Sequence, residues 1–483
     1  MIKETKTNEI PNGWIETSIE EISERIHYGY TASAESKNTG IRLLRITDIQ
    51  NHSVDWSQVP FCKISGEEVG KYELKEGDLV FARTGATVGK SYLLIGKIPK
   101  TVFASYLIRI ILYREVNKFF VYYFFQSPSY WQQIGMQALG IGQPNVNATT
   151  LSKLSIPLSP LAEQHRIVAK IEELFSDLED GIDSLKKAQA QLKTYRQAVL
   201  KYAFEGTLTA AWRQQHQPEP VEKLLAQIKA ERERQNAGNG KTKKPKEFPP
   251  LTEAELAALP KLPEGWRWVK LENIANKITD GEHIRPKIVE SGIYFLSAKD
   301  IRGNGVSFDN PLYVTKKDAE IYRRRCNPER GDILIVSRGA TVGRMCIVET
   351  DEIFCLLGSV ILIKVGQHLN SDYLTYILKS PFIQKILLNI SGSTAQQAIY
   401  LRDIKNIVIP ICLLEEQNQI VQEIESRLSV CDKLEEGLKE SLQKAEALRQ
   451  SILKKAFEGR LAPQDPNDEP AEKLLERIQA AKS

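Results

Sequence analysis

The stretch that decides the fold lies at 163–206 and reads EQHRIVAKIEELFSDLEDGIDSLKKAQAQLKTYRQAVLKYAFEG. It returns at 416–459 as EQNQIVQEIESRLSVCDKLEEGLKESLQKAEALRQSILKKAFEG, an offset of 253 residues (416 minus 163). In both stretches apolar residues recur every three or four positions over several heptads, as they do along the seam of a coiled coil. Each stretch ends on a glycine, Gly206 or Gly459, where a left-handed helix cap belongs. The pattern therefore predicts two long amphipathic helices.

Each helix is expected to span about 40 residues and so to rise about 60 Å. One chain with two such seams most simply packs them against each other, and the globular segment between them lets the pair close antiparallel. The alternative is that each amphipathic helix lies on its own domain. The residues predicted to pair the helices are Ile167, Ile171, Leu178, Leu185, Leu192, Val199, Ile420, Ile424, Leu438, Leu448 and Ile452.

The duplication extends beyond the helices. Four short motifs recur at nearly the same offset: PNGW at 11–14 and PEGW at 263–266, GD at 77–78 and 331–332, GATVG at 85–89 and 339–343, and IP at 156–157 and 409–410. A solenoid would repeat every 20–50 residues, so the repeated unit is a whole domain followed by a helix. A protein built as two unequal copies suggests a function that needs two similar but non-identical acts of recognition.

The segments before the long helices combine strand and helix patterns. Strands are expected at 41–49, 77–84, 106–112, 293–301, 331–338 and 359–365, and helices near 116–126 and 372–379. The predicted fold class is α+β, with two mixed α/β domains joined by two long antiparallel coiled-coil helices in a pseudo-twofold duplication.

Composition is that of a globular protein, with 42% hydrophobic and 26% charged residues. No apolar run approaches the ~18 residues of a membrane span, and the N-terminal residues are polar, so we expect a cytoplasmic protein without a membrane partner. The six cysteines show no CxxC spacing and are expected to be reduced thiols that bind no metal. The net charge of +4 is too small to indicate a nucleic-acid partner. Its distribution, with basic globular segments and slightly acidic helical ones, fits contact between the domains and a polyanion, although random surface scatter explains it equally well.

Catalytic motifs are missing. GATVGKS at 85–91 is one residue short of a phosphate-binding loop, and its counterpart at 339–345, GATVGRM, lacks both the lysine and the hydroxyl. The glycines are therefore predicted to make a tight turn between strands. SPSY at 127–130 and NPLY at 310–313 approach the methyltransferase motif that ends in Pro-Pro-Tyr, but both lack its second proline. Both are expected to be helix starts with proline in the first turn.

The ordered motifs, all present twice, resemble the specificity subunit of type I restriction-modification systems. The order is Pro-x-Gly-Trp, Gly-Asp with Gly-Ala-Thr-Val-Gly, Ile-Pro, Glu-Gln, a long helix and Ala-Phe-Glu-Gly, and it covers nearly the whole chain. The resemblance implies two target recognition domains that each recognise half of a bipartite double-stranded DNA target. It also implies that the two helices are a spacer between them.

The resemblance further implies partners that carry the chemistry. Two modification (methyltransferase) subunits would bring S-adenosylmethionine, and restriction subunits would add ATP- and magnesium-dependent activity, while this chain is non-catalytic and holds no cofactor. The implied segments are two target recognition domains (1–158 and 260–412), two spacer helices (159–207 and 413–460), a helical appendix with a basic linker (208–259) and a tail (461–483).

Because the two domains differ in sequence outside the motifs, the two half-sites should differ as well. Domains that read one side of B-DNA should lie about one helical turn apart, ~34–36 Å between centres. Candidate contacts with phosphate or base edges are the cations beside the glycine-rich turns, then cations near strand ends, then loop glutamines. In that order they are Arg83, Lys90, Arg338 and Arg344; Arg42, Arg45, Lys299 and Arg302; and Gln143, Gln396 and Gln397.

Two rival functions stay open. One is a coiled-coil adaptor that binds only protein, for which DNA binding would be absent or insensitive to salt. The other is an enzyme, either a fused methyltransferase or an ATPase, for which the isolated chain would show turnover. A basic run at 323–325 either faces phosphate or is a solvated helix face.

Overall fold

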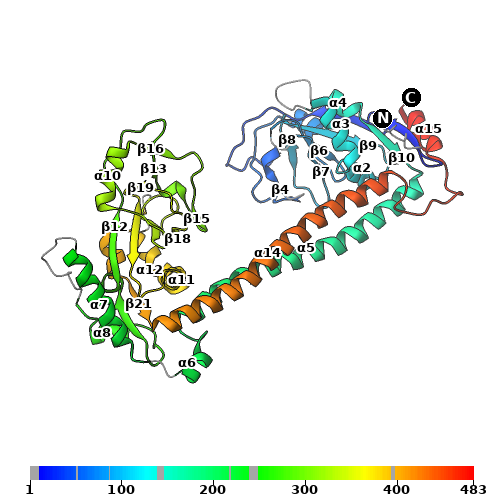
Figure 1. Cartoon of the computed structure of the whole chain (residues 1–483). Helices are drawn as coiled ribbons and strands as arrows, with labels where there is room; N and C mark the ends of the chain where they lie inside the picture. Colours follow the sequence, from blue (N-terminus) through cyan, green and yellow to red (C-terminus); the bar gives the residue numbers. More distant parts are fainter. Residues whose placement is uncertain are drawn as a thin grey trace, which may run out of the picture. The chain divides into compact units, whose positions relative to one another are not determined.

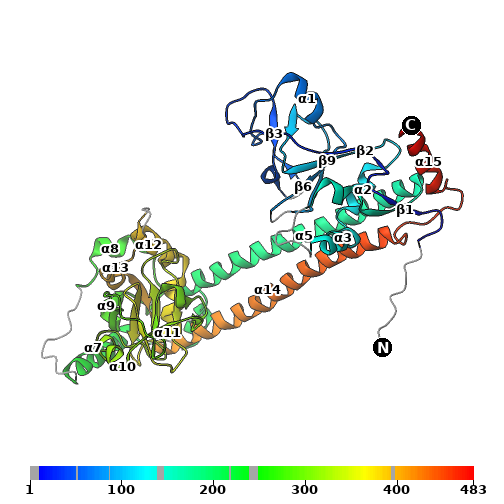
Figure 2. The same ribbon diagram turned by 90° about the horizontal axis from the view of Figure 1, so that it is seen from above.

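The computed structural model describes residues 10–50, 53–85, 88–138, 146–216, 219–238, 249–392 and 397–482. The chain forms two compact units: unit 1 combines Met1–Lys186 with Lys439–Ser483, and unit 2 is Lys187–Leu438. Each unit holds one mixed α/β domain and part of each of two long helices, α5 (Leu161–Phe204) and α14 (Leu414–Phe457) (Figures 1 and 2).

The domain of unit 1, called domain 1, is built on a four-stranded antiparallel sheet of order β2-β9-β6-β7. Its strands are β2 (Ser23–Tyr28), β9 (Leu107–Leu112), β6 (Leu79–Ala82) and β7 (Ser91–Leu93). β6 is buried along its whole length, which is why it reads as an unbroken apolar run rather than an alternating one. The smaller pairs are β1 (Ile15–Ser18) with β10 (Ser155–Leu158), β3 (Arg42–Leu44) with β8 (Thr101–Phe103), and β4 (Ile49–Gln50) with β5 (Ser53–Val54).

Domain 2, in unit 2, repeats this topology as β12-β20-β17-β18. Those strands are β12 (Ala275–Asp280), β20 (Val360–Val365), β17 (Ile333–Val336) and β18 (Met345–Ile347). The other strands are β11 (Arg267–Lys270), β13 (Ile293–Leu296), β14 (Ile301–Arg302), β15 (Gly305–Val306), β16 (Leu312–Val314), β19 (Phe354–Leu356) and β21 (Val408–Ile411).

Short helices complete both units. Unit 1 has α1 (Gly66–Tyr72), α2 (Lys118–Phe124), α3 (Pro128–Ala138), α4 (Ala148–Ser152) and α15 (Ala471–Lys482). Unit 2 has α6 (Ala210–His216), α7 (Val221–Gly238), α8 (Glu253–Ala257), α9 (Leu271–Ile274), α10 (Lys316–Arg325), α11 (Ser371–Lys379), α12 (Pro381–Ser391) and α13 (Leu401–Asn406). None of the helices in the described ranges is both long and apolar enough to cross a membrane.

All six predicted strands exist, but the two predicted at 41–49 and 293–301 are shorter than expected. A 3₁₀ turn interrupts each one, at Ile46–Asp48 and at Ala298–Asp300. In each turn the aspartate side chain accepts a hydrogen bond from a backbone amide three residues earlier, at 2.8 Å. Such local side-chain bonds compete with strand pairing, and the apolar pattern does not reveal them.

The predicted turns and helix starts are mostly confirmed. GATVG lies between β6 and β7, and its counterpart between β17 and β18, with the bounding glycines at positive φ (82° and 80°, 99° and 83°). Helices α3 and α12 begin at Pro128 and Pro381. The same expectation for Asn310-Pro311 is wrong. Asn310 adopts a left-handed φ of 52° and leads into strand β16, because the residues that follow are β-prone.

The two long helices run antiparallel. In unit 1 Arg449 of α14 lies 3.4 Å from Glu179 of α5, and in unit 2 Arg196 of α5 lies 2.6 Å from Asp432 of α14. As the residue number rises along α5 from Glu179 to Arg196, the residue number of its partner on α14 falls from Arg449 to Asp432. Of the predicted pairing residues, Ile167, Ile171, Val199, Ile420, Ile424 and Ile452 are buried, and Leu178, Leu185, Leu192 and Leu438 are half-buried.

One predicted pairing residue is not buried. Leu448 is 51% exposed, whereas Leu453, which the heptad count left out, is fully buried. A straight α-helix drifts about 20° per heptad from a strict seven-residue repeat, so the buried stripe rotates along the helix. In the last turns of α14 the stripe faces domain 1, where Phe457 packs 5.0 Å from the ring of Phe120 and 5.5 Å from that of Phe124. The ends of the helices thus belong to the domain cores.

In unit 1, α15 packs on domain 1. α15 contributes the buried residues Ala471, Leu474 and Ile478 to the core of domain 1, and the amide of Ala471 donates to the carbonyl of Gly13 at 2.9 Å. Figure 1 shows α15 in red beside the strands of domain 1. In unit 2, α7 packs on domain 2 through Val221, Leu224 and Ile228, at the matching position.

Candidate nucleic-acid interface

The motifs that both units share are structural. The indole Nε1 of Trp14 donates to the Glu163 carboxylate at 2.9 Å, and that of Trp266 donates to Glu416 at 2.9 Å. The glutamine after each glutamate accepts a hydrogen bond from a domain amide, also at 2.9 Å in both units. Pro-x-Gly-Trp and Glu-Gln therefore form a buried joint that fastens each domain to the start of its long helix.

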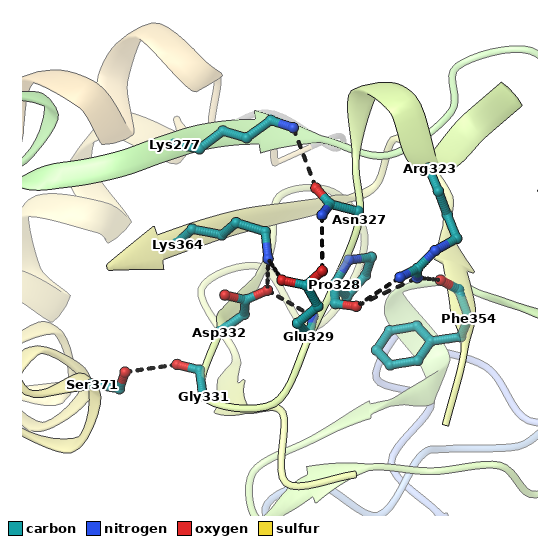
Figure 3. A network of polar contacts seen from close by, with 10 residues as sticks. All are labelled: Lys277, Arg323, Asn327, Pro328, Glu329, Gly331, Asp332, Phe354, Lys364 and Ser371. Atoms are coloured by element: carbon teal, nitrogen blue, oxygen red, sulfur yellow. Dashed lines mark hydrogen bonds and ion pairs between the residues drawn. The ribbon is translucent and has the colours of Figure 1, made fainter. Parts of the chain in front are cut away.

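The Gly-Asp motif is a second structural element. Asp332 accepts a hydrogen bond from the amide of Glu329 at 2.7 Å and pairs with Lys364 at 2.6 Å (Figure 3). Burial raises the pKa of Asp332, and the ammonium group of Lys364 opposes that rise. In domain 1, Asp78 pairs with Arg109 in the same place, with both side chains 5% exposed. These aspartates hold the turn before β6 and β17 and are not available to a ligand.

The ends of the sheet strands form a backbone frame that is identical in the two domains. In domain 1 the amide of Gly29 donates to Leu107, that of Arg83 donates to Tyr106, and that of Val146 donates back to Arg83, at 3.2, 3.1 and 3.1 Å. In domain 2 the same three bonds measure 3.1, 2.8 and 2.8 Å and join Gly281 to Val360, Ser337 to Ser359, and Ile399 to Ser337. The frame thus fixes equivalent positions in both domains.

A glycine is required at one corner of this frame. A Cβ added to Gly29 would lie 2.3 Å from the carbonyl oxygens of Phe103 and Ala104, and one added to Gly281 would lie 2.1 Å from that of Leu356. Real Cβ atoms do not approach backbone oxygen so closely. The chain after β2 or β12 is therefore held against the chain that follows β8 or β19.

Domain 1 carries aromatic and cationic side chains on the frame. The guanidinium of Arg83 lies over the ring of Tyr28 at 4.9 Å, and the Tyr28 hydroxyl accepts a hydrogen bond from the amide of Ala148 at 3.0 Å. Tyr106, whose carbonyl belongs to the frame, is 63% exposed. This arrangement is suited to a planar, electron-rich ligand such as a base edge.

Domain 2 carries different chemistry at the same positions. Asp280 stands where domain 1 has Tyr28, and serines stand in place of Arg83 and Tyr106. Asp280 is ion-paired with Arg325 of α10, and Nε2 of His283 lies 3.0 Å from its carboxylate. Ser337 is buried. The exposed groups at this frame are thus Arg325 and His283.

The predicted DNA-contacting residues of domain 1 fall into two groups. Arg83 lies on the frame and Lys90, which follows the glycine-rich turn, is exposed. Arg42 donates to the carbonyl of Val59 and stacks 4.6 Å from the ring of Phe61, and Arg45 pairs with Asp48 at 2.7 Å. The last two arginines serve the fold through intramolecular partners. Gln143 lies outside the described residues.

In domain 2 the predicted residues gather at two places. Arg338 is exposed, and its backbone forms an isolated antiparallel β-bridge with Ala398, which is the neighbour of exposed Gln397. Arg344 donates to the carbonyl of Ile301 at 3.3 Å, which places it beside the β14–β15 hairpin, where Arg302 is exposed. Lys299 is exposed on the preceding 3₁₀ turn, and Gln396 lies outside the described residues.

Several residues of the frame escaped sequence reasoning. Tyr28 and Tyr106 look like ordinary strand-end aromatics, and Asp280 and His283 belong to no motif. In the sequence, Arg323 and Arg325 stand out only as part of a basic run. Arg323 donates to the carbonyl of Phe354 at 2.7 Å (Figure 3), so its guanidinium is engaged within the fold. Within the described ranges, no group of three His, Cys, Asp or Glu side chains is placed to hold a metal ion.

Comparison with known proteins identifies relatives of the whole arrangement. The family model of the type I restriction modification DNA specificity domain matches residues 11–187 and 263–444. The chain is similar to the type I restriction enzyme EcoBI specificity subunit of Escherichia coli, with 28% identity over 76% of this chain and 73% of the relative. It is also similar to the EcoKI specificity subunit of E. coli strain K12, with 23% identity over 98% of this chain and 96% of the relative.

Solved structures share the fold. The HsdS subunit from Thermoanaerobacter tengcongensis aligns with a TM-score of 0.52 and 20% identity over 93% of this chain and 98% of that one. A chain from a structure that addresses complex assembly and conformational transition of the type I R-M system aligns with a TM-score of 0.67 and 21% identity, over 94% and 99%. At these identities the likeness concerns the fold.

Proposed function

The chain belongs to the family of type I restriction-modification DNA specificity proteins, and from this premise we propose that it is the subunit that selects the DNA sequence for such a complex. The observation that carries the proposal is the shared frame with different side chains. Two domains hold the same strand ends by the same backbone hydrogen bonds, yet they present aromatic and cationic groups in one case and an aspartate, a histidine and an arginine in the other. Two such surfaces suit an asymmetric, bipartite double-stranded DNA target.

The parts of the chain that occur twice indicate where partner subunits bind. The motifs that occur in both units build the joints and the helix pair, so they offer two similar surfaces to two copies of a partner. We propose that two modification (methyltransferase) subunits dock there, and that restriction subunits join the same assembly. The helix pair would serve as the spacer that sets the gap between the half-sites. A coiled-coil adaptor without DNA recognition is not favoured, because the matched family is a DNA specificity domain.

The chemistry is assigned to the partners. S-adenosylmethionine on the modification subunits would supply the methyl group, and ATP and magnesium would act on the restriction subunits. This chain would contribute binding and positioning only. We also assign it to the cytoplasm, since all six of its cysteines are free and buried, as is usual for proteins of a reducing compartment.

The experiment is to express the chain with its cognate modification subunit in a host and to map methylated bases by sequencing. The expected result is one asymmetric target with two half-sites and a fixed gap. Replacing 1–160 by the corresponding domain of another such protein should change one half-site and leave the other. If both half-sites changed, or if DNA binding were absent or insensitive to salt, the proposal would be wrong.

A further inference from the structure

Each domain presents one guanidinium group that is held in place by the residue at the end of β2 or β12. We propose that Arg83 and Arg325 are the residues that read a guanine in the two half-sites, and that Tyr28 and Asp280 are positioning residues that orient them. This inference rests on the proposed function, since it assigns base contacts to surfaces taken to bind DNA.

The two positioning residues occupy the same place in the frame. Tyr28 pairs with Ile108 of β9, and Asp280 pairs with Ile361 of β20. Each is followed by the glycine whose Cβ would collide with a backbone oxygen at 2.3 or 2.1 Å. The backbone at both positions is therefore fixed, and the side chain projects from a rigid support.

The arginines reach these positions from different elements. Arg83 follows β6 and lies 4.9 Å over the Tyr28 ring, whereas Arg325 comes from the last turn of α10 and is ion-paired with the Asp280 carboxylate. His283 also contacts Arg325, with Nε2 3.3 Å from its Nη2. One position thus orients an arginine by cation–π attraction in domain 1 and by a charge-assisted hydrogen bond in domain 2. The two guanidinium groups are thus held at equivalent frame positions but come from different elements of the two domains.

Base contact is favoured over phosphate contact by the way the side chains are held. Phosphate contacts position a protein without carrying sequence information, and mobile surface cations make them well. A guanidinium whose plane is fixed can instead donate two parallel hydrogen bonds to O6 and N7 of guanine. The Arg83 side chain is half-buried and its buried Nε finds no acceptor among the described residues, while the Arg325 side chain is 49% exposed at its ion pair.

The neighbouring arginines of α10 provide a contrast within one helix. Arg323 donates to the carbonyls of Phe354 and Pro328, which leaves it inside the fold. Arg324 is exposed and carries the same charge on the same helix. A nonspecific electrostatic role would be shared by Arg324 and Arg325, whereas a base contact would belong to Arg325. Arg324→Ala is therefore the matched control.

The test uses the full chain assembled with its modification subunit and a pool of DNA duplexes randomised across the target. Arg83→Lys and Arg325→Lys keep the charge but lose the planar pair of donors. Each should reduce the preference for guanine at one position of one half-site by about 5- to 150-fold and leave the other half-site unchanged. Arg324→Ala should lower binding to all sequences alike without changing any preference.

The positioning residues are tested by rescue. Tyr28→Leu removes the ring and should relax the same base position as Arg83→Lys, while Tyr28→Phe keeps the ring and should retain the preference. Asp280→Asn should relax the position that depends on Arg325. A purely structural role would lower binding to every sequence, and circular dichroism of each variant identifies those that are misfolded.

Two outcomes would overturn the inference while leaving the proposed function intact. One is that the lysine variants keep the full preference at every position. The other is that they change affinity for all sequences alike without relaxing any base position, as expected if the arginines contact phosphate rather than a base edge. If the unsubstituted complex selected no sequence at all, the proposed function itself would fail.

Discussion

The buried joints allow a quantitative test because the two units build the same joint with unequal support. In unit 2 the side chain of Glu416 is 1% exposed and accepts hydrogen bonds from Trp266 at 2.9 Å and from Thr209 at 2.6 Å. It also pairs with Arg213, which is 14% exposed. In unit 1, Glu163 accepts from Trp14 at 2.9 Å, and the nearby Arg166 is bound to Asp468. The substitution Glu416→Ala should therefore cost more than Glu163→Ala.

The expected magnitudes follow from the groups left behind. Glu416→Ala leaves the half-buried guanidinium of Arg213 without its counter-charge, which costs about 3–5 kcal/mol, although the guanidinium still donates to Thr209 and to the carbonyl of Gly206. The same substitution leaves the Trp266 indole and the Thr209 hydroxyl without an acceptor. Each unsatisfied donor costs about 1–3 kcal/mol, but these costs are not additive with that of the unpaired guanidinium. Glu163→Ala strands the Trp14 indole and should cost about 1–3 kcal/mol. Burial raises the pKa of Glu163, which agrees with a carboxylate that is less well compensated. The centres of the two ranges differ by about 2 kcal/mol, which is the expected difference between the units.

Hydrogen exchange of the full chain, read by mass spectrometry of peptides, measures the opening free energy of each unit separately. Glu416→Ala should speed exchange in the strands of domain 2, and Glu163→Ala should speed it less in those of domain 1. Glu416→Gln is the control, because it keeps the shape and an acceptor oxygen and should cost about 1.5–3 kcal/mol. Equal losses in the two units, or a larger loss in unit 1, would show that Arg213 and Thr209 do not support the joint as argued.

Three further outcomes are expected. Deleting 461–483 removes the buried side chains of α15 and should destabilise unit 1 by about 3–6 kcal/mol. Hydrogen exchange in unit 2 should stay unchanged, and an equal loss of stability in both units would refute this expectation. Burial lowers the pKa of His27 to about 4, so the folded protein holds this ring neutral while the unfolded chain protonates it as the pH falls below 6.5. The free energy of unfolding, measured with urea, should therefore fall by about 1–2 kcal/mol between pH 6.5 and pH 4, and the variant His27→Gln should lack this pH dependence. Leu453→Ala should lower the free energy of unfolding by about 2–5 kcal/mol, and Leu448→Ala should lower it by less than about 1 kcal/mol. If thermal unfolding showed the larger loss for Leu448→Ala, the strict seven-residue pattern would describe the buried stripe better than the rotated one.

The sequence predicts the fold well where the pattern is local and repeated. The long helices, the glycine-rich turns and the paired copies all follow from spacing, and the family resemblance follows from their order. The helix register is predicted less well. Leu448 and Leu453 are both leucines on the same helix, and which of them is buried depends on how the apolar stripe rotates to face domain 1. The Asn310 turn was missed because a proline in the first turn of a helix looks the same in sequence as a proline before a strand.

The candidate site is harder to predict because its partners are far apart in the chain. Arg83 is found in the sequence because it stands beside a glycine-rich turn, but its partner Tyr28 lies on another strand. Arg325 is separated by 45 residues from Asp280, and the basic run around it draws attention to charge rather than to the ion pair. Arg42 and Arg45 share the same sequence features as Arg83 and are used by the fold. Only the tertiary structure distinguishes an arginine that is oriented for a ligand from one that is consumed within the protein.

Because an arginine and its positioning residue come from different elements, specificity in this architecture belongs to pairs rather than to single side chains. The residue before the C-cap of α1 in domain 1 is Tyr72, which packs 5.4 Å from Tyr30, and the corresponding residue of α10 in domain 2 is Arg325. Changing Tyr28 to aspartate alone would therefore remove the ring under Arg83 without supplying the arginine that an aspartate orients in domain 2. The backbone frame can stay unchanged while such pairs are exchanged, since its hydrogen bonds involve no side chain. A duplicated frame with exchangeable pairs accounts for how one fold presents two different recognition surfaces.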